Sequence, residues 1–175
     1  MEEERPEGSA PPLYVDRSPF DAFYAREYQP LLRLAWTLTG RRDLGEELVQ
    51  ETMLAAHGTW AKVSGYASPG GWARRVLLNN ARSFARSRAA EVRALDRVAR
   101  PGPSVDLAPP DDELWAEVRR LPERQAQVVA LHYLEDLSVA DIAALLGITT
   151  ATTKVHLHRG RQALAARLRD PKEEK

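Results

Sequence analysis

The clearest pattern of apolar and polar positions lies near the end of the chain, in LSVADIAALLGITTATTKVHLHRGRQAL, residues 137–164. Ser138 and Asp141 have the spacing of a capping box and Gly147 is typical of a helix end, so they predict a short helix. A second helix is expected to follow, because small and apolar residues recur there in steps of three and four. Its inward stripe is Thr153, Leu157, Gly160, Leu164 and Leu168, which would pack against Ile142, Leu145, Leu146 and Ile148. Two short helices with so tight a turn predict a helix-turn-helix.

The outer face of this second helix carries cations and no acids. It consists of Ala151, Val155, His158, Arg159 and Gln162, with Lys154 on its flank. No carboxylate occurs between Ile142 and Arg169. Such a face favours an anionic partner, and a helix of this kind fits the major groove of DNA.

Another long helix is predicted close to the N-terminus. It is expected to start at Ser18 and Pro19 and to end at Gly40, with a kink at Pro30. Its residues at helical spacing are Phe20, Phe23, Tyr24, Leu31, Ala35 and Leu38.

The next helix is expected to start at a capping box formed by Asp43 and Glu46 and to reach about His57. Its inner side is expected to consist of Leu44, Leu48, Thr52 and Ala55. The segment WAKVSGYASPGG, residues 60–71, predicts a loop, because it holds three glycines and a proline. An arginine-rich helix is expected to follow over residues 72–90.

A break in composition divides the chain in two. Residues 101–110, PGPSVDLAPP, hold four prolines and a glycine and cannot continue a helix. Beyond them, Leu114, Val118 and Leu121 precede a helix expected from Pro122 to Leu134. The sequence has no strand pattern and no internal repeat. We therefore expect an all-α protein of two small helical domains joined by a Pro-rich linker.

Composition narrows the class of protein further. The chain has 175 residues and no cysteine, which excludes disulfides, thiolate metal sites and cysteine nucleophiles. Its longest apolar run is far short of the roughly 20 residues that a membrane-spanning helix needs. The tail over residues 1–17 is acidic and Pro-rich, unlike a signal peptide, and is expected to be disordered. We therefore expect a cytoplasmic protein.

The net formal charge is zero, but the charges are segregated along the chain. Residues 72–100 hold eight arginines and only two acids, and residues 154–169 hold five cations and no acid. The balancing acids lie in the N-terminal tail, in residues 43–51 and in residues 111–117. Because DNA phosphates bind basic surfaces, this distribution predicts two elements that contact nucleic acid and a separate acidic surface for another kind of partner.

These elements, in this order, resemble the extracytoplasmic-function (ECF) sigma factors, small RNA polymerase specificity subunits of the bacterial sigma-70 family. YQPLLRLAWTLTGRRDLGEELVQETMLAAHGTW is similar to the part of their region 2 that grips the polymerase, and GWARRVLLNNARSFARSRA to their promoter minus-10 segment. LPERQAQVVALHYLEDLSVADIAALLGITTATTKVHLHRGRQAL is similar to their region 4, whose last helix reads the minus-35 element. The resemblance implies a region 2 helical bundle over residues 18–92, a linker over 93–110, a region 4 helix-turn-helix domain over 111–169 and a short tail over 170–175.

The resemblance also implies which residues meet each partner. The residues expected at core RNA polymerase are Glu46, Glu47, Gln50 and Glu51. Carboxylates and an amide on one helix surface suit arginines of a partner protein, although this pattern alone is equally typical of a solvated helix face.

The residues expected at minus-10 DNA are Trp60, Lys62, Tyr66, Trp72, Arg74, Arg75, Asn79, Asn80, Arg82 and Arg86. There the aromatics suit stacking on an unpaired base, the asparagines suit base edges and the arginines suit phosphates; the alternatives are core packing and a charged solvated helix.

The residues expected at minus-35 DNA are Thr150, Thr152, Lys154, Val155, His156 and Arg159. Arg159 is the expected base reader, and Val155 is suited to a thymine methyl group. Val155 and His156 stand where family members often have serine and arginine, and Ser83 stands where many have aspartate. We therefore expect a shifted promoter specificity.

No catalytic, metal or cofactor site is expected. His156 and His158 diverge by about 200° on a helix, and the sequence has no Glu-x-x-His motif, phosphate-binding loop or nucleophile elbow.

The implied partners are core RNA polymerase, double-stranded promoter DNA, the melted non-template strand and an anti-sigma protein of the kind that commonly holds family members inactive. No membrane insertion is expected. Such a protein would be nucleoid-associated when active. The alternative is a helix-turn-helix transcriptional regulator whose helical N-terminal domain senses a signal or dimerises; an adaptor that binds only protein fits two basic helices less well.

Overall fold

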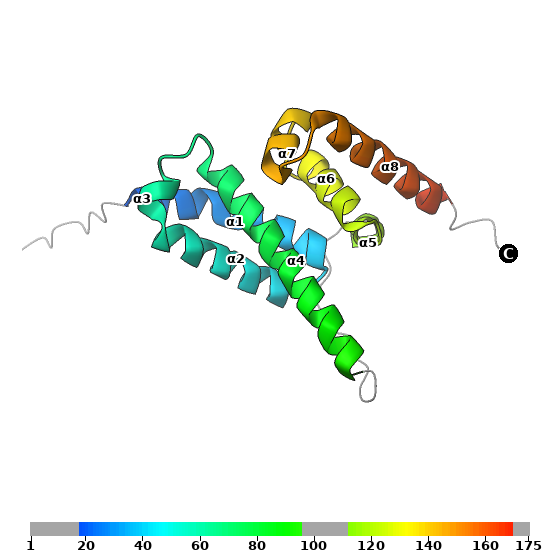
Figure 1. Ribbon diagram of the computed structural model, residues 1–175, viewed down its shortest axis with the longest axis horizontal. Coiled ribbons are helices and arrows are strands. Elements are labelled where there is room, and N and C mark those ends of the chain that lie inside the picture. Colours follow the sequence, from blue (N-terminus) through cyan, green and yellow to red (C-terminus); the bar gives the residue numbers. More distant parts are fainter. Residues whose placement is uncertain (1–17, 96–111, 170–175) are drawn as a thin grey trace, which may run out of the picture.

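The computed structural model describes residues 18–95 and 112–169, and every element in these ranges is a helix. Helices α1 (Pro19–Thr39), α2 (Arg42–Gly58), α3 (Trp60–Val63) and α4 (Pro69–Leu95) form one bundle. Helices α5 (Asp112–Arg119), α6 (Glu123–Tyr133), α7 (Val139–Leu146) and α8 (Thr150–Arg169) form a second (Figure 1). The expectation of an all-α protein with two small helical domains is confirmed. The expected tails and residues 96–110 of the expected linker lie outside the described residues.

Helix α1 begins and ends where the sequence predicts. The Ser18 hydroxyl accepts a hydrogen bond from the backbone N–H of Asp21, and the Asp21 carboxylate accepts one from the backbone N–H of Ser18. The helix ends at Gly40, whose φ of 69° is a conformation that glycine adopts without strain. Pro30 lies inside the helix, which continues past it. Buried side chains join α1 to α2 and α4, namely Leu31, Leu34, Val49 and Leu77.

The second bundle contains the predicted helix-turn-helix. The Ser138 hydroxyl caps α7 by accepting a hydrogen bond from the backbone N–H of Asp141, and Gly147 ends the helix with a φ of 66°. Helix α8 approaches α6 closely at Gly160, where an added Cβ would lie 2.8 Å from Cγ2 of Val129. The predicted inward residues Thr153, Leu157, Gly160 and Leu164 are buried. Leu168 was predicted wrongly, because it lies in the last turn of α8 and is 47% exposed.

The two bundles touch each other. Helix α1 contacts α5 and α6, and α4 contacts α7. A groove of about 480 Å³ lies between the bundles, with Leu38, Leu78 and Phe84 on one wall and Leu121 and Ala126 on the other. The N-terminal half of α4 therefore faces the second bundle as well as the other helices of the first bundle.

None of the helices in the described ranges is long and apolar enough to cross a membrane.

Two details of α2 differ from the prediction. The expected capping box at Asp43 is wrong: the helix starts at Arg42 with no side-chain cap, and the Asp43 carboxylate pairs with the guanidinium of Arg41 instead. Leu44, Leu48 and Thr52 are buried as expected, but Ala55 is exposed while its neighbour Ala56 is fully buried. The inner stripe of α2 therefore ends one residue later than predicted.

The segment predicted as a loop is partly helical. Trp60–Val63 forms the short helix α3, and α4 starts at Pro69, a proline in the first turn, rather than at residue 72. Helix α4 then continues to Leu95, so the first three residues of the expected linker extend the helix. Gly70 and Gly71, which were expected in the loop, lie in the first turn of α4.

Candidate nucleic-acid interface

The outer face of α8 is open to solvent. Lys154, His158, Arg159 and Gln162 are exposed, and Val155 exposes 46% of its surface between them. Neither Lys154 nor Arg159 has an ion-pair partner in the parts of the chain that the structure describes. This surface presents two free cations and an apolar side chain on one helix face, an arrangement suited to a DNA groove.

The start of α8 is held by threonines. The backbone N–H of Thr152 donates to the Thr149 hydroxyl at 3.1 Å, and the two hydroxyl groups lie 2.8 Å apart. Thr150 is exposed beside them. His156 is half-buried, and its Nδ1 is a buried atom without a hydrogen-bond partner in the described structure. The six residues expected at minus-35 DNA therefore lie on one helix, with His156 set back from the exposed face; their contacts with DNA stay predictions.

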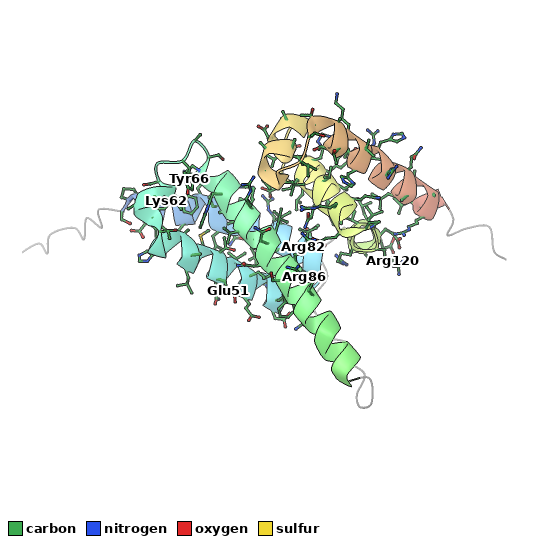
Figure 2. The ribbon with its side chains drawn as sticks, in the orientation of Figure 1. Glu51, Lys62, Tyr66, Arg82, Arg86 and Arg120 are labelled. Carbon is green, nitrogen blue, oxygen red and sulfur yellow. The ribbon has the colours of Figure 1, made fainter. Side chains whose placement is uncertain are left out.

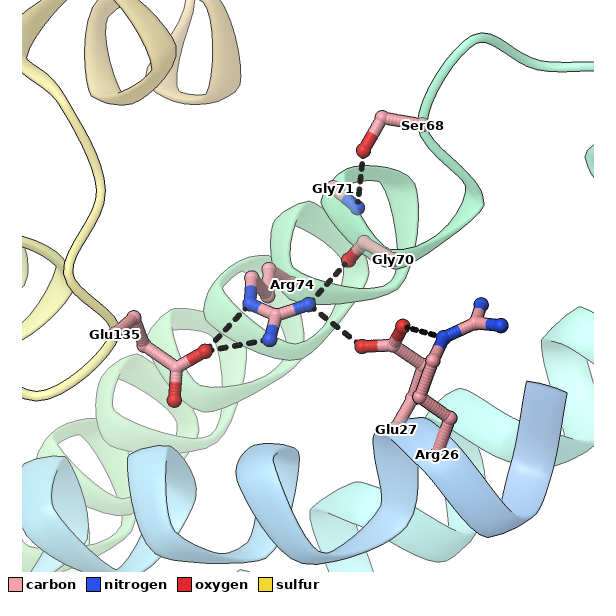
Figure 3. A network of polar contacts seen from close by, with 7 residues as sticks. All are labelled: Arg26, Glu27, Ser68, Gly70, Gly71, Arg74 and Glu135. Carbon is pink, nitrogen blue, oxygen red and sulfur yellow. Dashed lines mark hydrogen bonds and ion pairs between the residues drawn. The ribbon is translucent and has the colours of Figure 1, made fainter.

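Arginines of α4 occupy a different environment. Arg74 lies between the bundles and is held by carboxylates from both (Figure 3). Its Nη1 donates to Glu27 of α1 at 2.8 Å and to the carbonyl of Gly70 at 3.1 Å, and its Nε donates to Glu135 of the α6–α7 loop at 2.7 Å. The Arg74 side chain is 14% exposed and that of Glu135 only 4%. Arg74 is therefore the centre of a buried ion network that joins the two bundles.

The charges of this network stabilise one another. Burial alone would raise the pKa of Glu27, but hydrogen bonds from Arg26 and Arg74 outweigh it and hold that pKa below its ordinary value. Burial alone would lower the pKa of Arg74, but its hydrogen bond to Glu27 and the charge of Glu135 raise that pKa above its ordinary value. Both groups therefore stay ionised in the folded protein at neutral pH.

The next arginines along α4 point to the second bundle or to solvent. Arg75 donates to the carbonyls of Leu145 and Ala144 at 2.7 and 2.6 Å, at the C-terminal end of α7. Arg82 pairs with Glu123 of α6 across 3.4 Å. Arg86 is exposed without an ion-pair partner among the described residues.

The asparagines of α4 have two different positions. Asn79 is exposed, whereas Asn80 is partly buried in a hollow of about 280 Å³. The remaining walls of that hollow come from Glu47, Leu48, Glu51, Ser83 and Phe84. Asn80 thus lies beside the acidic side chains of α2.

The three aromatics of the predicted base-binding group have different environments. The Trp60 ring packs against Phe23 and Phe20, with centroids 4.9 and 5.4 Å apart, so it belongs to the core of the first bundle. Trp72 is partly buried against that core. Tyr66 and Lys62 are exposed at the end of the bundle that carries α3 (Figure 2). A cleft of about 1010 Å³ runs from Tyr66 and Trp72 to the helix-turn-helix.

The acidic face of α2 is largely open to solvent, and its Glu47 and Glu51 border the hollow shared with α4. Glu47, Gln50 and Glu51 are exposed, whereas Glu46 is half-buried and pairs with Arg42 across 3.0 Å. Leu54, which was not predicted from the sequence, is 72% exposed one turn beyond Gln50 on this face. Its spacing of four residues from Gln50 was the available signal. Across residues 18–95 and 112–169, no three histidine or carboxylate side chains gather as a possible metal site.

Comparison with known proteins agrees with this arrangement. The family described as Sigma-70 region 2 matches residues 23–91, and Sigma-70, region 4 matches residues 111–164. ECF RNA polymerase sigma factor EcfG of Rhodopseudomonas palustris is 31% identical over 79% of this chain and 80% of its own length. ECF RNA polymerase sigma factor SigF of Caulobacter vibrioides is 35% identical over 71% and 70%. The chain spans only 60% of SigE of Mycolicibacterium smegmatis, to which it is 31% identical over 83% of its own residues.

Solved structures share the fold. The sigma factor RpoE, in a co-crystal with the anti-sigma factor NepR from Bartonella quintana, has a TM-score of 0.73 with 23% identity. That match covers 87% of this chain and 98% of RpoE. CnrH, in complex with the cytosolic domain of CnrY, has a TM-score of 0.63 with 22% identity, covering 87% of this chain and 88% of CnrH. At this identity the likeness establishes the helical architecture of the two bundles.

Proposed function

This chain belongs to the ECF group of the sigma-70 family, and on that premise we propose that it directs core RNA polymerase to promoters as a specificity subunit. The observation that carries the proposal is the presence of two basic helices, α4 and α8, on separate bundles, with an acidic helix face on α2. A subunit that reads two promoter elements and docks on a large enzyme needs these three surfaces. Its place of work is the nucleoid in the cytoplasm.

In this function the second bundle reads the minus-35 element. The exposed face of α8 enters the major groove, where Arg159 hydrogen-bonds a base edge and Val155 contacts a thymine methyl group. Lys154, Thr150 and Thr152 contact phosphates at the helix start. The unpaired cations of this face support the assignment, because an exposed arginine breaks no ion pair within the protein when it hydrogen-bonds a guanine edge.

The first bundle binds the polymerase and the minus-10 element. Glu47, Gln50, Glu51 and the exposed Leu54 form the polymerase surface, with Glu46 at its edge. Residues of α3, of α4 and of the loop between them hold the melted non-template strand. The set comprises Lys62, Tyr66, Trp72, Arg74, Arg75, Asn79, Asn80, Arg82 and Arg86. Trp60 supports that set from the core. The protein opens DNA by binding the melted form more tightly, which shifts an equilibrium without a cofactor or a catalytic residue.

The second candidate is a transcriptional regulator with the same helix-turn-helix and a helical sensing domain. It accounts for α8 but gives no role to an acidic α2 face placed beside an arginine-rich α4. The two candidates differ in whether the protein binds core RNA polymerase.

Run-off transcription tests the proposal. The purified protein is added to bacterial core RNA polymerase with a library of genomic promoter fragments. Discrete transcripts that require the protein support a sigma factor and give its promoter sequence directly. Absence of both transcripts and core binding favours the regulator, whereas core binding without transcripts indicates that a promoter or an activator is missing from the assay.

A further inference from the structure

Anion-binding side chains of α4 are already occupied by the second bundle. The Arg74 guanidinium donates to Glu135 through Nε and also lies 2.5 Å from it through Nη2. Glu135 lies in the loop between α6 and α7 and is the less exposed partner. All three guanidinium nitrogens of Arg74 are thus engaged by Glu27, Glu135 or the Gly70 carbonyl, so a phosphate has to compete with these partners.

The second contact uses the end of a helix. Arg75 donates to the carbonyls of Ala144 and Leu145, which belong to the last turn of α7. These carbonyls carry the negative end of the helix dipole, so a guanidinium is a favourable partner there. We call Arg74, Arg75, Glu135 and these two carbonyls the interdomain clasp. The pair of Arg82 and Glu123 adds a weaker contact about two turns further along α4.

The clasp has a consequence for promoter binding. Promoter elements named minus-35 and minus-10 are separated by about 25 base pairs, or roughly 85 Å of duplex at 3.4 Å per base pair. A folded body of about 175 residues has a radius of gyration of only about 16 Å. With α4 held against α7, the outer face of α8 and the DNA-binding face of α4 cannot reach two sites so far apart.

We propose that the interdomain clasp is an autoinhibitory contact, in which Glu135 and the C-terminal end of α7 occupy the arginines of α4 in place of DNA phosphate. The bundles must separate before Arg74 and Arg75 can bind the melted strand, and the strand in turn favours the separated state. This inference rests on the proposed function for its biological meaning. The closed state itself is measurable without polymerase.

Distance measurements on the full chain test the clasp. Because the native sequence has no cysteine, Ala61→Cys on α3 and Ala165→Cys on α8 supply two unique, exposed positions for a fluorescent donor and acceptor. Single-molecule energy transfer then reports the ratio of separated to closed molecules. Glu135→Gln is expected to raise this ratio by at least about tenfold, because it leaves a buried arginine with one carboxylate.

The matched control is Asp136→Asn, which removes the same charge one residue later. Asp136 is exposed and has a φ of 50°, a conformation that asparagine tolerates. This control is expected to leave the ratio unchanged. Binding of a short single-stranded DNA oligonucleotide, measured by fluorescence anisotropy, is expected to tighten several-fold for Glu135→Gln and to stay constant for Asp136→Asn.

Unchanged energy transfer in a folded Glu135→Gln protein would overturn the clasp, as would separation without tighter DNA binding. If circular dichroism shows that Glu135→Gln unfolds the second bundle, Arg75→Gln decides instead, because Arg75 is exposed and its guanidinium belongs to the clasp. An increase of about twofold in the separated fraction supports the clasp, and no increase overturns it. A protein that separates as expected but gives no transcripts with polymerase contradicts the proposed function and leaves the clasp in place.

Discussion

The two basic helices α4 and α8 carry similar charges, but the cations of α8 are unpaired whereas Arg74 and Arg75 of α4 are held by partners. Lys154 and Arg159 of α8 extend into solvent with no ion-pair partner among the described residues. On α4, Arg74 and Arg75 are held by a carboxylate and by backbone carbonyls of the other bundle. The count of basic residues on a helix therefore identifies a surface for anions, but it does not say whether that surface is available.

The two helices differ in this way because only α4 packs beside acidic side chains of other elements. No acid lies between Ile142 and Arg169, so α8 brings no carboxylate to its own cations. Helix α4 passes α1 and α7, and it meets Glu27 from one and Glu135 from the loop before the other. In the proposed function, the α8 cations would meet DNA without losing a protein partner, whereas Arg74 and Arg75 of α4 would first have to give up theirs.

The largest effect on stability is expected at Arg74, the arginine of α4 that pairs with two carboxylates. Arg74→Ala removes the cation shared by Glu27 and Glu135, which are 11% and 4% exposed, and so leaves two buried carboxylates without it. We expect a loss of about 3–5 kcal/mol in the free energy of unfolding, measured by urea denaturation. Arg159→Ala on α8 is the matched control and should change stability by less than about 0.5 kcal/mol. Equal losses for both variants would contradict the comparison.

Arg159 should instead show its effect in DNA selectivity. Arg159→Ala is expected to cost about 1–3 kcal/mol of discrimination at one minus-35 base pair, because a bidentate contact to a base edge is lost. Competition binding among promoter fragments that differ at single positions measures this. Lys154→Ala provides the contrast, since loss of a phosphate contact weakens all fragments alike. If Arg159→Ala also weakens every fragment equally, Arg159 is a phosphate contact and not a base reader.

The contrast between α8 and α4 also separates what could be predicted from the sequence from what could not. The helix-turn-helix depends on signals within a few residues. The helix start at Ser138, the helix end at Gly147 and the burial of Leu157 were predicted correctly, whereas Leu168 was not. The expected capping box is half formed, because the Asp141 carboxylate accepts from the Ser138 hydroxyl and not from its backbone N–H. The network at Arg74 depends on partners 47 and 61 residues away in the sequence. No periodicity within α4 indicates which acid will lie beside it in the fold.

Aromatic residues show the same limit. Trp60 stands beside a Gly-rich segment, which favours a stacking role, but its ring packs on Phe20 and Phe23 from the start of α1. Tyr66, six residues later, has similar neighbours in the sequence and is 38% exposed. Local composition therefore located the aromatic group, whereas tertiary packing decided which of its members faces solvent.

A smaller effect is expected on α2, where Glu47 and Gln50 are exposed as the outer face of α8 is. Changing Glu47 and Gln50 together to lysine should weaken binding to core RNA polymerase by about tenfold, because it replaces attraction to a basic partner with repulsion. The double variant should keep its thermal stability, since both side chains are exposed. Core affinity measured by fluorescence anisotropy checks this, and an unchanged value would remove these residues from the polymerase surface.

The smallest effect is expected from pH, through Glu27 alone. Its folded pKa lies below the ordinary value of 4.5, so the ionised carboxylate adds stability that is fully present above pH 4.5. That stability is lost as the pH falls from 4.5 through the folded pKa, because the folded state then takes up a proton and the ion pair with Arg74 weakens. The loss is smaller than that of Arg74→Ala, since Arg74 keeps Glu135 as a partner. Urea denaturation at pH 7 and at lower pH should therefore show a weaker acid dependence in Glu27→Gln than in the native protein, and equal slopes would mean that other carboxylates dominate the acid response.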